Sequence, residues 1–292
     1  MKERLKYKPI VGCMRWGIWG EHFTTKQYEQ IIDQCLSIEL NIFDHADIYG
    51  HYTTEADFGK ALKDNNSLRN KIQLITKCGI NMLTPNRPHH NIKSYDTSKS
   101  HIISSVEQSL KNFNTDYIDT LLIHRPDVLI DVEEVAETIA LLKKEGKVKS
   151  FGVSNFTTSQ VSLLNSYVTI EHHQVEISVT HLNAFNYGVL DQCKIKNIQA
   201  QSWSPMGNGL FTEVSEKNSR ILFVAEELAK TYLCSINQIL LAFVYAHPSN
   251  IVPVIGTTKF ERIVEAKEAM KIELKREDFY KLWSASTGKE VA

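Results

Sequence analysis

Short runs of β-branched and other apolar residues alternate along this chain with longer amphipathic stretches. The short runs have the length of buried strands, and the longer stretches repeat apolar residues every three or four positions, like one face of a helix. Strands are predicted over residues 9–14, 41–44, 72–77, 117–123, 148–153, 172–176, 199–202 and 252–255. Helices are predicted over residues 25–38, 55–63, 98–111, 131–145, 159–166, 187–197, 219–231, 235–246, 259–270 and 277–284. This alternation predicts βα units and a parallel sheet.

The number of strand–helix units decides between two α/β architectures. Eight units are the number that closes a (β/α)8 TIM barrel, and such barrels form one domain of about 250 residues. An open doubly wound sheet that bound a dinucleotide would carry G-x-G-x-x-G after its first strand. The sequence lacks that motif, and Gly207-Asn208-Gly209 falls late in the chain. We therefore expect a single barrel domain over residues 1–292.

Local chemistry supports several helix ends. Thr24 and Gln27 have the spacing of a capping box ahead of the first helix. Asp131 offers a cap oxygen at the start of the helix over residues 131–145, and Gly146 follows that helix as a stop signal.

Composition and charge exclude several classes of function. Lys and Arg total 33 against 34 for Asp and Glu, so the net charge is −1 and a nucleic-acid partner is not expected. No apolar run approaches the roughly 20 residues that span a bilayer, and the N-terminal segment lacks the apolar core of a signal peptide. The five cysteines are dispersed, which is typical of reduced thiols in a cytoplasmic protein. A monomer and a small homo-oligomer both fit these observations.

Polar side chains gather where the predicted strands end. In a barrel, the carboxyl ends of the strands meet on one face, which carries the active site. Asp44 and Tyr49 follow the second strand, Lys77 ends the third, and His124 follows the fourth. Each has an ordinary structural use as a turn residue, packing residue, ion-pair partner or core imidazole. Their joint position at successive strand ends favours catalysis.

The segments that carry these residues resemble the aldo-keto reductases, most closely a bacterial branch known only as predicted oxidoreductases. The matching segments are FDHADIYG, ITKCG, LLIHRPD, GVSNF, HHQVEIS, SWSPMGNG and VIGTTKFERI. The likeness runs from Val11 to Arg262. It implies a TIM barrel that reduces an aldehyde or ketone to an alcohol with NADPH.

The chemistry of carbonyl reduction explains why four such residues are needed. The reaction needs a hydride and a proton, and Tyr49 matches the family's proton donor. A free tyrosine has a pKa near 10, so we expect the Lys77 ammonium, held by Asp44, to lower the pKa of Tyr49. His124 matches the residue that orients and polarises the substrate carbonyl.

The resemblance also implies a nicotinamide cofactor site. Ser154, Asn155 and Gln174 match the residues that bind the carboxamide, and Trp203 replaces the usual Tyr that stacks on the ring. The remaining predicted cofactor residues follow the seventh and eighth strands: Ser204, Met206, Gly256, Thr257, Thr258, Lys259 and Arg262. Arg262 matches the residue beside the 2′-phosphate, which favours NADPH over NADH. Gly256 and Ala266 replace the family's usual Lys and Asn, which weakens that preference.

The substrate pocket is expected under loops at the same face. Trp16 and Trp19 are the predicted substrate-binding residues, and residues 79–97 form a loop longer than most βα connections. No spacing of His residues resembles a zinc site, so no metal is expected.

The resemblance implies that the partner is a small-molecule carbonyl compound. Two alternatives stay open: an NADPH-binding regulatory subunit with little turnover, and an unrelated metal-dependent barrel hydrolase.

Overall fold

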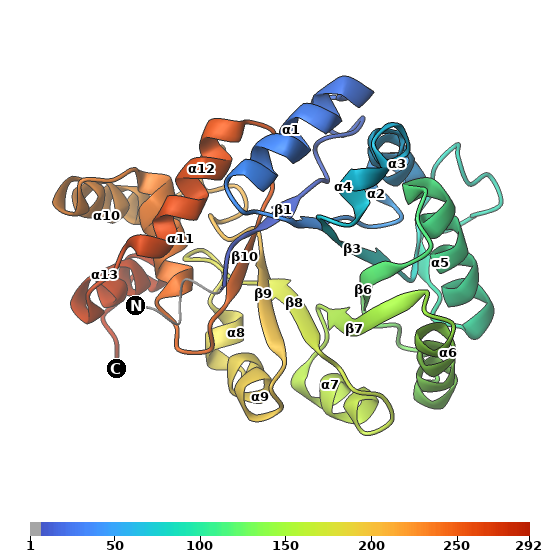
Figure 1. Ribbon diagram of the computed structural model, residues 1–292. Coiled ribbons are helices and arrows are strands. Elements are labelled where there is room, and N and C mark those ends of the chain that lie inside the picture. The colour runs from blue at the N-terminus through green and yellow to red at the C-terminus, as the bar shows by residue number, and fades with distance from the viewer. Residues whose placement is uncertain (1–6) are drawn as a thin grey trace. The chain divides into compact units, whose positions relative to one another are not determined.

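The computed structural model describes residues 7–292. Eight strands form a closed parallel barrel in the order β1-β10-β9-β8-β7-β6-β3-β2 (Figure 1). They are β1 (Ile10–Gly12), β2 (Ile42–Asp44), β3 (Gln73–Cys78), β6 (Ile118–Ile123), β7 (Val148–Ser154), β8 (His172–Glu176), β9 (Gln199–Trp203) and β10 (Val252–Ile255). Each strand overlaps one predicted from the sequence, so the predicted (β/α)8 fold is confirmed.

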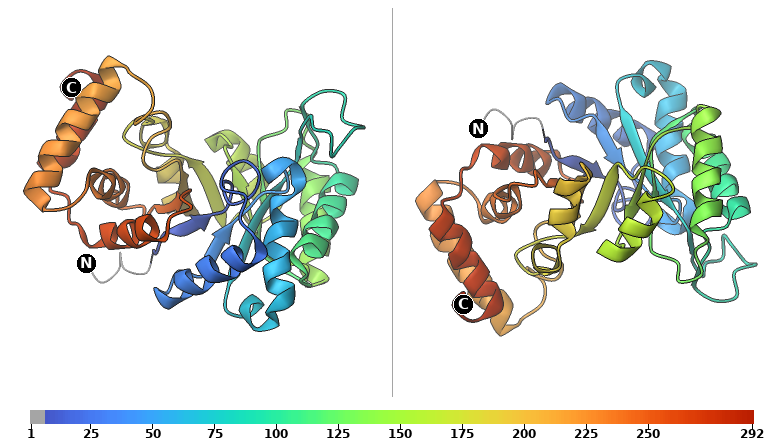
Figure 2. Two further views of the ribbon diagram at one scale, coloured as in Figure 1. Left: turned by 90° about the horizontal axis from the view of Figure 1, so that it is seen from above. Right: turned by 90° about the horizontal axis from the view of Figure 1, so that it is seen from below.

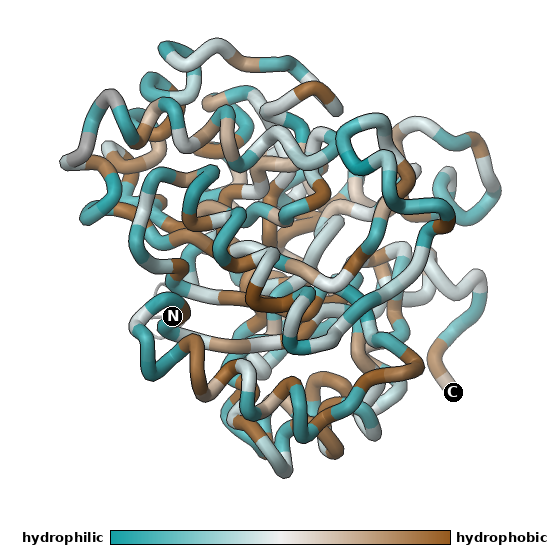
Figure 3. Tube along the Cα trace, turned by 90° about the vertical axis from the view of Figure 1, so that its right-hand side faces the viewer, coloured by the Kyte–Doolittle hydropathy of each residue, from teal (hydrophilic) through white to brown (hydrophobic). Residues whose placement is uncertain are grey.

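Helices follow the strands along the chain. The longer ones are α1 (Thr25–Ser37), α3 (Thr54–Asp64), α5 (Lys99–Phe113), α6 (Val132–Lys144), α7 (Thr158–Asn165), α9 (Val189–Ile195), α10 (Glu216–Tyr232), α11 (Ile236–Tyr245), α12 (Phe260–Glu268) and α13 (Arg276–Thr287). The cap signals are confirmed: Thr24 and Gln27 form a capping box, and Asp131 accepts hydrogen bonds from two amides of α6. Hydrophilic and hydrophobic positions, coloured teal and brown, alternate along the helical turns of the chain (Figure 3).

Several short elements were not predicted from the sequence. Inside the expected loop over residues 79–97, β4 (Ile80–Asn81) pairs antiparallel with β5 (Ser94–Tyr95). The short helices α2 (Tyr49–Tyr52), α4 (Asn66–Arg69) and α8 (Asn183–Asn186) also lie in predicted connections. The helix predicted over residues 259–270 is α12 followed by a 3-10 turn (Ala269–Lys271). Elements of this length hold too few apolar residues to show a period.

The chain divides into two compact units. The first unit contains residues 10–174 and 256–260, and the second contains residues 175–255 and 261–292 with the described residues before 10.

An aromatic cluster fills the space behind β2 in the first unit. Trp16, fully buried, packs against Phe23, Tyr28, Phe43 and Phe58 at ring distances of 5.8–6.3 Å. Helices α3 and α5 pack closely here because α3 carries a glycine. A Cβ on Gly59 would meet the carbonyl oxygen of Asn112 at 1.8 Å, so no larger residue fits without moving the helices apart.

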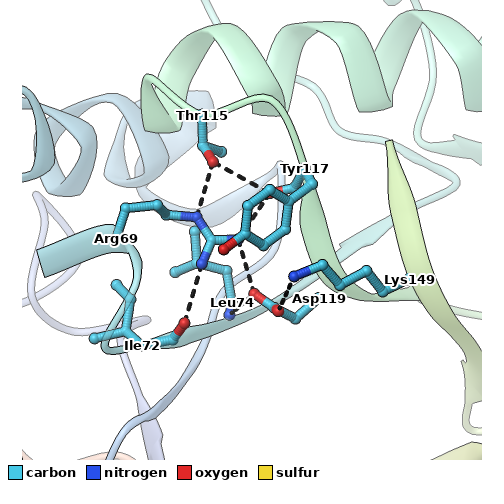
Figure 4. A network of polar contacts seen from close by, with 7 residues as sticks. All are labelled: Arg69, Ile72, Leu74, Thr115, Tyr117, Asp119 and Lys149. Atoms are coloured by element: carbon cyan, nitrogen blue, oxygen red, sulfur yellow. Dashed lines mark hydrogen bonds and ion pairs between the residues drawn. The ribbon is translucent and has the colours of Figure 1, made fainter. Parts of the chain in front are cut away.

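A cluster of ionic and polar groups joins the amino ends of β3, β6 and β7 (Figure 4). Arg69 donates to the carboxylate of Asp119 at 2.8 Å, to the Thr115 hydroxyl at 2.8 Å, and to the Ile72 and Tyr117 carbonyls at 3.0 and 2.8 Å. Asp119 also accepts from the Leu74 amide and pairs with Lys149. The Tyr117 ring lies 3.8 Å from the Arg69 guanidinium and 3.4 Å from the Lys149 ammonium. We call Arg69, Asp119 and Lys149 the amino-end cluster.

The second unit has its own aromatic core around the buried helix α11. Phe243 of α11 stacks on Phe279 of α13 with ring centroids 4.4 Å apart, and Phe185 and Trp283 lie beside them. Helix α13 also lies along α10 (Figure 2).

Within residues 7–292, no single helix is long and apolar enough to cross a membrane. Helices α10 and α11, which meet at a bend of 93°, have the length and composition of a membrane-spanning segment only when both are counted together.

Candidate active site

The predicted catalytic residues and several predicted cofactor residues belong to the first unit. Asp44 is the last residue of β2, and Lys77 lies near the end of β3. His124 directly follows β6, Ser154 ends β7, and Gln174 lies in β8. The parallel register of β2 on β3 and of β3 on β6 brings these strand ends to one edge of the sheet.

Lys77 is the centre of the site. Its buried Nζ contacts the Asp44 carboxylate at 2.6 Å and donates to the His45 carbonyl at 2.7 Å. The same nitrogen lies 3.3 Å from the Tyr49 hydroxyl. The structure therefore joins Asp44, Lys77 and Tyr49 in the chain of contacts that sequence reasoning expected.

A left-handed turn holds Tyr49 in place. Gly50, His51 and Tyr52 have φ values of 58°, 56° and 69°, a conformation that residues with side chains rarely adopt. A Cβ on Gly50 would meet the Thr54 hydroxyl at 2.4 Å, so this position requires glycine. The Tyr52 hydroxyl donates to the Ile80 carbonyl and accepts from the Met82 amide. Those bonds anchor the segment that carries Tyr49, and strain of this kind is typical of functional sites.

Burial dominates the electrostatics of Tyr49. It raises the pKa of Tyr49 above its usual value, although the Lys77 ammonium beside the hydroxyl acts in the opposite direction. The expected effect of Lys77 is present, but the expected net lowering of this pKa is wrong, because sequence reasoning omitted the loss of solvent. Burial alone would lower the pKa of Lys77, but the Asp44 carboxylate and Tyr49 raise it, so Lys77 stays charged.

His124 is a neutral imidazole next to Tyr49. Burial lowers its pKa well below the usual value, and the charges of Lys77, Arg125 and Lys93 add to this effect. Its ring meets the Tyr49 ring edge-on at 6.2 Å. Its Nδ1 is buried without a hydrogen-bond partner. A neutral ring with an unused nitrogen can form a hydrogen bond to a bound ligand.

Gln174 has a contact that sequence reasoning missed. Its side-chain amide donates to the second oxygen of Asp44 at 2.8 Å, so Lys77 and Gln174 hold the two carboxylate oxygens. Asn155, in a left-handed conformation, donates to the Ser154 hydroxyl at 2.7 Å and to the His124 carbonyl at 3.2 Å. The three predicted carboxamide-binding residues therefore lie around the catalytic cluster.

The two tryptophans predicted to bind substrate differ in position. Trp19 lies 6.1 Å from the Tyr49 ring and 5.3 Å from His51, and it is partly exposed. Trp16 is fully buried in the aromatic cluster, and its indole N–H donates to the Thr257 carbonyl at 3.2 Å. Those contacts make Trp16 a packing residue that holds the turn after β10.

The other predicted cofactor residues divide between the units. In the first unit, the Thr257 hydroxyl accepts from the Lys259 amide, and the Thr258 hydroxyl faces Glu21 at 3.5 Å. Gly256 and Lys259 are exposed. In the second unit, Trp203 ends β9, Ser204 follows in a left-handed conformation, Met206 lies in the next turn, and Arg262 is exposed near the start of α12.

Comparison with known proteins agrees with this architecture. A model of the aldo/keto reductase family matches residues 10–286. The uncharacterized oxidoreductase YcsN of Bacillus subtilis is 40% identical over 100% of this chain and 98% of its own length. The 6-dehydroglucose reductase of Agrobacterium fabrum is 37% identical over 100% of this chain and 98% of its own length.

A solved structure shares the fold. The aldo/keto reductase of Klebsiella pneumoniae, crystallised with NADP and acetate, superposes with a TM-score of 0.73 at 22% identity, over 94% of this chain and 89% of that one. Because the family model matches most of the chain and the relatives align over its full length, this protein belongs to the aldo/keto reductase family and is an NAD(P)H-dependent oxidoreductase.

Proposed function

We propose that this protein reduces an aldehyde or ketone to an alcohol with NADPH, and that Tyr49 supplies the proton. The observation that carries the proposal is the buried Lys77 ammonium, which contacts both the Asp44 carboxylate and the Tyr49 hydroxyl. A tyrosine in contact with a fixed cation can lose its proton and be stabilised as phenolate. The family match supports oxidoreduction, and the geometry supports these residues as its machinery.

The proton transfer can be assigned atom by atom. The Tyr49 hydroxyl donates its proton to the substrate oxygen as negative charge develops there. Lys77 stabilises the resulting phenolate, and Asp44 keeps Lys77 charged and oriented. The neutral ring of His124 donates a hydrogen bond to the same substrate oxygen, as a preorganised oxyanion donor. NADPH, when bound, supplies the hydride.

The residues around the cluster fit a nicotinamide cofactor. The buried polar groups of Ser154 and Gln174 and the half-buried amide of Asn155 offer donors and acceptors to a carboxamide, and the family resemblance assigns the stacking face to Trp203 of the second unit. For the phosphates we propose the turn formed by Gly256, Thr257, Thr258 and Lys259 in the first unit. The family resemblance assigns Ser204, Met206 and Arg262 of the second unit to the same cofactor. The positive charges of Lys259 and Arg262 suit the 2′-phosphate of NADPH. The Klebsiella relative was crystallised with NADP, which agrees with this choice.

The substrate is proposed to enter beside Trp19 and Tyr49. The name of the Agrobacterium relative makes an oxidised sugar with an aldehyde group a reasonable first substrate. Small aliphatic aldehydes, aromatic aldehydes, dicarbonyls and quinones complete the panel.

The experiment follows NADPH oxidation across this panel in wild-type protein and in Tyr49→Phe. Tyr187→Phe is the matched control, because Tyr187 is 70% exposed and lies in the second unit. We expect turnover in the wild type and control, and a loss of turnover in Tyr49→Phe with cofactor binding retained. Turnover that survives in Tyr49→Phe would reject the proposed proton donor. Tight NADPH binding with no turnover on any compound would instead favour a regulatory subunit on the same fold.

A further inference from the structure

A pocket in the first unit contains none of the proposed catalytic residues. Its volume is about 320 Å³, and its walls come from the start of α3, from α5 and from the segment between β4 and β5. The residues that matter for its chemistry are Asp47, Tyr52, Arg87, His90, His101 and Ser104. Asp47 lies two positions before Tyr49 and Tyr52 three positions after it, so the pocket adjoins the segment that carries the proton donor.

Arg87 presents a fixed cation to this pocket. Its guanidinium carbon lies 4.5 Å from the centroid of the Tyr52 ring, and one N–H donates to the Asn86 carbonyl. In the part of the chain that the structure describes, Arg87 forms no ion pair. A guanidinium that lies over an aromatic ring still has N–H groups in the fork geometry that binds carboxylate and phosphate.

Asp47 presents a buried carboxyl group with one unpartnered oxygen. The residue is 8% exposed, and its Oδ1 has no hydrogen-bond partner. Burial raises the pKa of Asp47 well above its usual value, and the nearby Glu55 adds to the rise, while a hydrogen bond from the Ile48 amide and the charges of Arg87 and Lys77 oppose it. These conditions favour the protonated acid, which can donate a hydrogen bond to an anion.

The other polar groups of the pocket do not compete for Arg87. The Glu55 carboxylate already accepts hydrogen bonds from Thr76, Ser109 and Asn112. His90 donates Nδ1–H to the Met82 carbonyl, so its neutral ring has only an acceptor nitrogen left and supplies no donor to an anion. Burial lowers the pKa of His101, so its ring is a neutral neighbour.

We propose that this pocket binds a small oxyanion, a phosphate or a carboxylate group, on the guanidinium of Arg87. The carboxylic acid of Asp47 and the hydroxyl of Ser104 complete its hydrogen bonds. A bound anion would lock Arg87 onto Tyr52 and so brace the left-handed turn that follows Tyr49. The site is separate from the carbonyl-binding cluster and does not depend on the reaction proposed above.

The test is calorimetric titration of the full-length protein with inorganic phosphate and, separately, with succinate, at constant ionic strength. We expect saturable binding of at least one anion, and the arm that binds identifies the source of the oxyanion. Arg87→Gln should weaken binding by about tenfold to a hundredfold, the value of a charge-assisted pair. Arg276→Gln is the matched control, because it removes an exposed arginine of α13 and should change nothing.

Two further variants distinguish an anion site on Arg87 from a cation site and from binding at the catalytic cluster. Asp47→Asn keeps a neutral donor and should retain binding, whereas a pocket that used an ionised Asp47 to bind cations would lose its ligand. His124→Ala should leave binding intact, because an anion at the catalytic cluster would depend on His124. The proposal is overturned if neither anion binds, if Arg87→Gln and Arg276→Gln behave alike, or if binding disappears in His124→Ala.

Discussion

Two ionic clusters lie at opposite ends of the same strands in the first unit, and their hydrogen bonding differs. In the amino-end cluster, Arg69 directs its N–H groups at four acceptors, and Asp119 accepts from Arg69, a backbone amide and Lys149. At the carboxyl ends, Lys77 is equally well bound, but one of its partners is the hydroxyl of Tyr49, which can lose a proton. Beside it, Nδ1 of His124 has no partner.

This difference supports a structural role for the amino-end cluster and the proposed reactive role for the other. A buried polar network whose members are all hydrogen-bonded holds strands together and has no unused donor or acceptor for a ligand. A cluster with an ionisable hydroxyl and an unpartnered imidazole nitrogen keeps a proton to transfer and a nitrogen that can form a further hydrogen bond. Unpartnered atoms alone are insufficient evidence, since both ring nitrogens of the buried His45 also have no partner, and that ring meets Phe58 and Phe113 edge-on. The His124 ring differs because it meets the ring of Tyr49, whose hydroxyl contacts the Lys77 ammonium.

The largest effect is expected from Lys77→Met. Loss of the ammonium leaves the Tyr49 phenolate unsupported, and turnover should fall about 10²- to 10⁴-fold. Asp44 also loses its counter-charge at a buried position, and stability should fall by about 3 kcal/mol or more. Steady-state rates and urea unfolding measure the two effects. Unchanged turnover in a folded Lys77→Met would remove the lysine from the mechanism.

Arg69→Met is the counterpart at the amino ends of the same strands. It removes the guanidinium from Asp119 and from the Ile72 and Tyr117 carbonyls at a largely buried position, so the free energy of unfolding should fall by about 3 kcal/mol. Turnover below the unfolding transition should stay within about twofold of wild type, because no proposed catalytic residue contacts Arg69. A large fall in turnover at unchanged stability would show that the division between the two ends is wrong.

Gln174→Leu tests whether the Asp44 carboxylate needs its second donor. Reduction requires protonated Tyr49, so kcat/KM should fall as the pH rises through the pKa of Tyr49. Asp44 raises that pKa, and removal of the Gln174 hydrogen bond strengthens the field of the carboxylate. We therefore expect the alkaline limb of the pH profile to move to higher pH. Because a Tyr49 with a higher pKa is a weaker proton donor, kcat/KM at neutral pH should fall by about tenfold.

Ser154→Ala is the control for this experiment. Ser154 is also predicted to contact the carboxamide, but the hydrogen bonds of Asp44 come from Lys77 and Gln174. It should weaken cofactor binding without moving the alkaline limb. Equal shifts in both variants would mean that Gln174 acts only through the cofactor.

The sequence was sufficient to predict the barrel and the convergence of the proposed catalytic residues. Runs of β-branched residues locate strands, and parallel strands place their carboxyl ends on one face, so Asp44, Lys77 and His124 could be grouped without coordinates. The contact between Gln174 and Asp44 joins residues 130 positions apart and depends on side-chain geometry that no periodicity encodes. The pKa of Tyr49 depends on how much solvent the fold excludes. The burial of Trp16 could not be predicted either, because it depends on how the surrounding helices and rings pack in the folded protein.

The smallest effect should come from Lys149→Met, at the edge of the amino-end cluster. The Lys149 side chain is 53% exposed, and its ion pair with Asp119 spans 3.3 Å, so the pair should contribute about 0.5 kcal/mol. Methionine keeps an apolar stem over the Tyr117 ring and removes only the charge. The difference from wild type in urea unfolding should shrink further as salt is added, because exposed charges are screened. A loss as large as that of Arg69→Met, insensitive to salt, would show that the cluster acts as one unit and that Lys149 is as essential to it as the buried arginine.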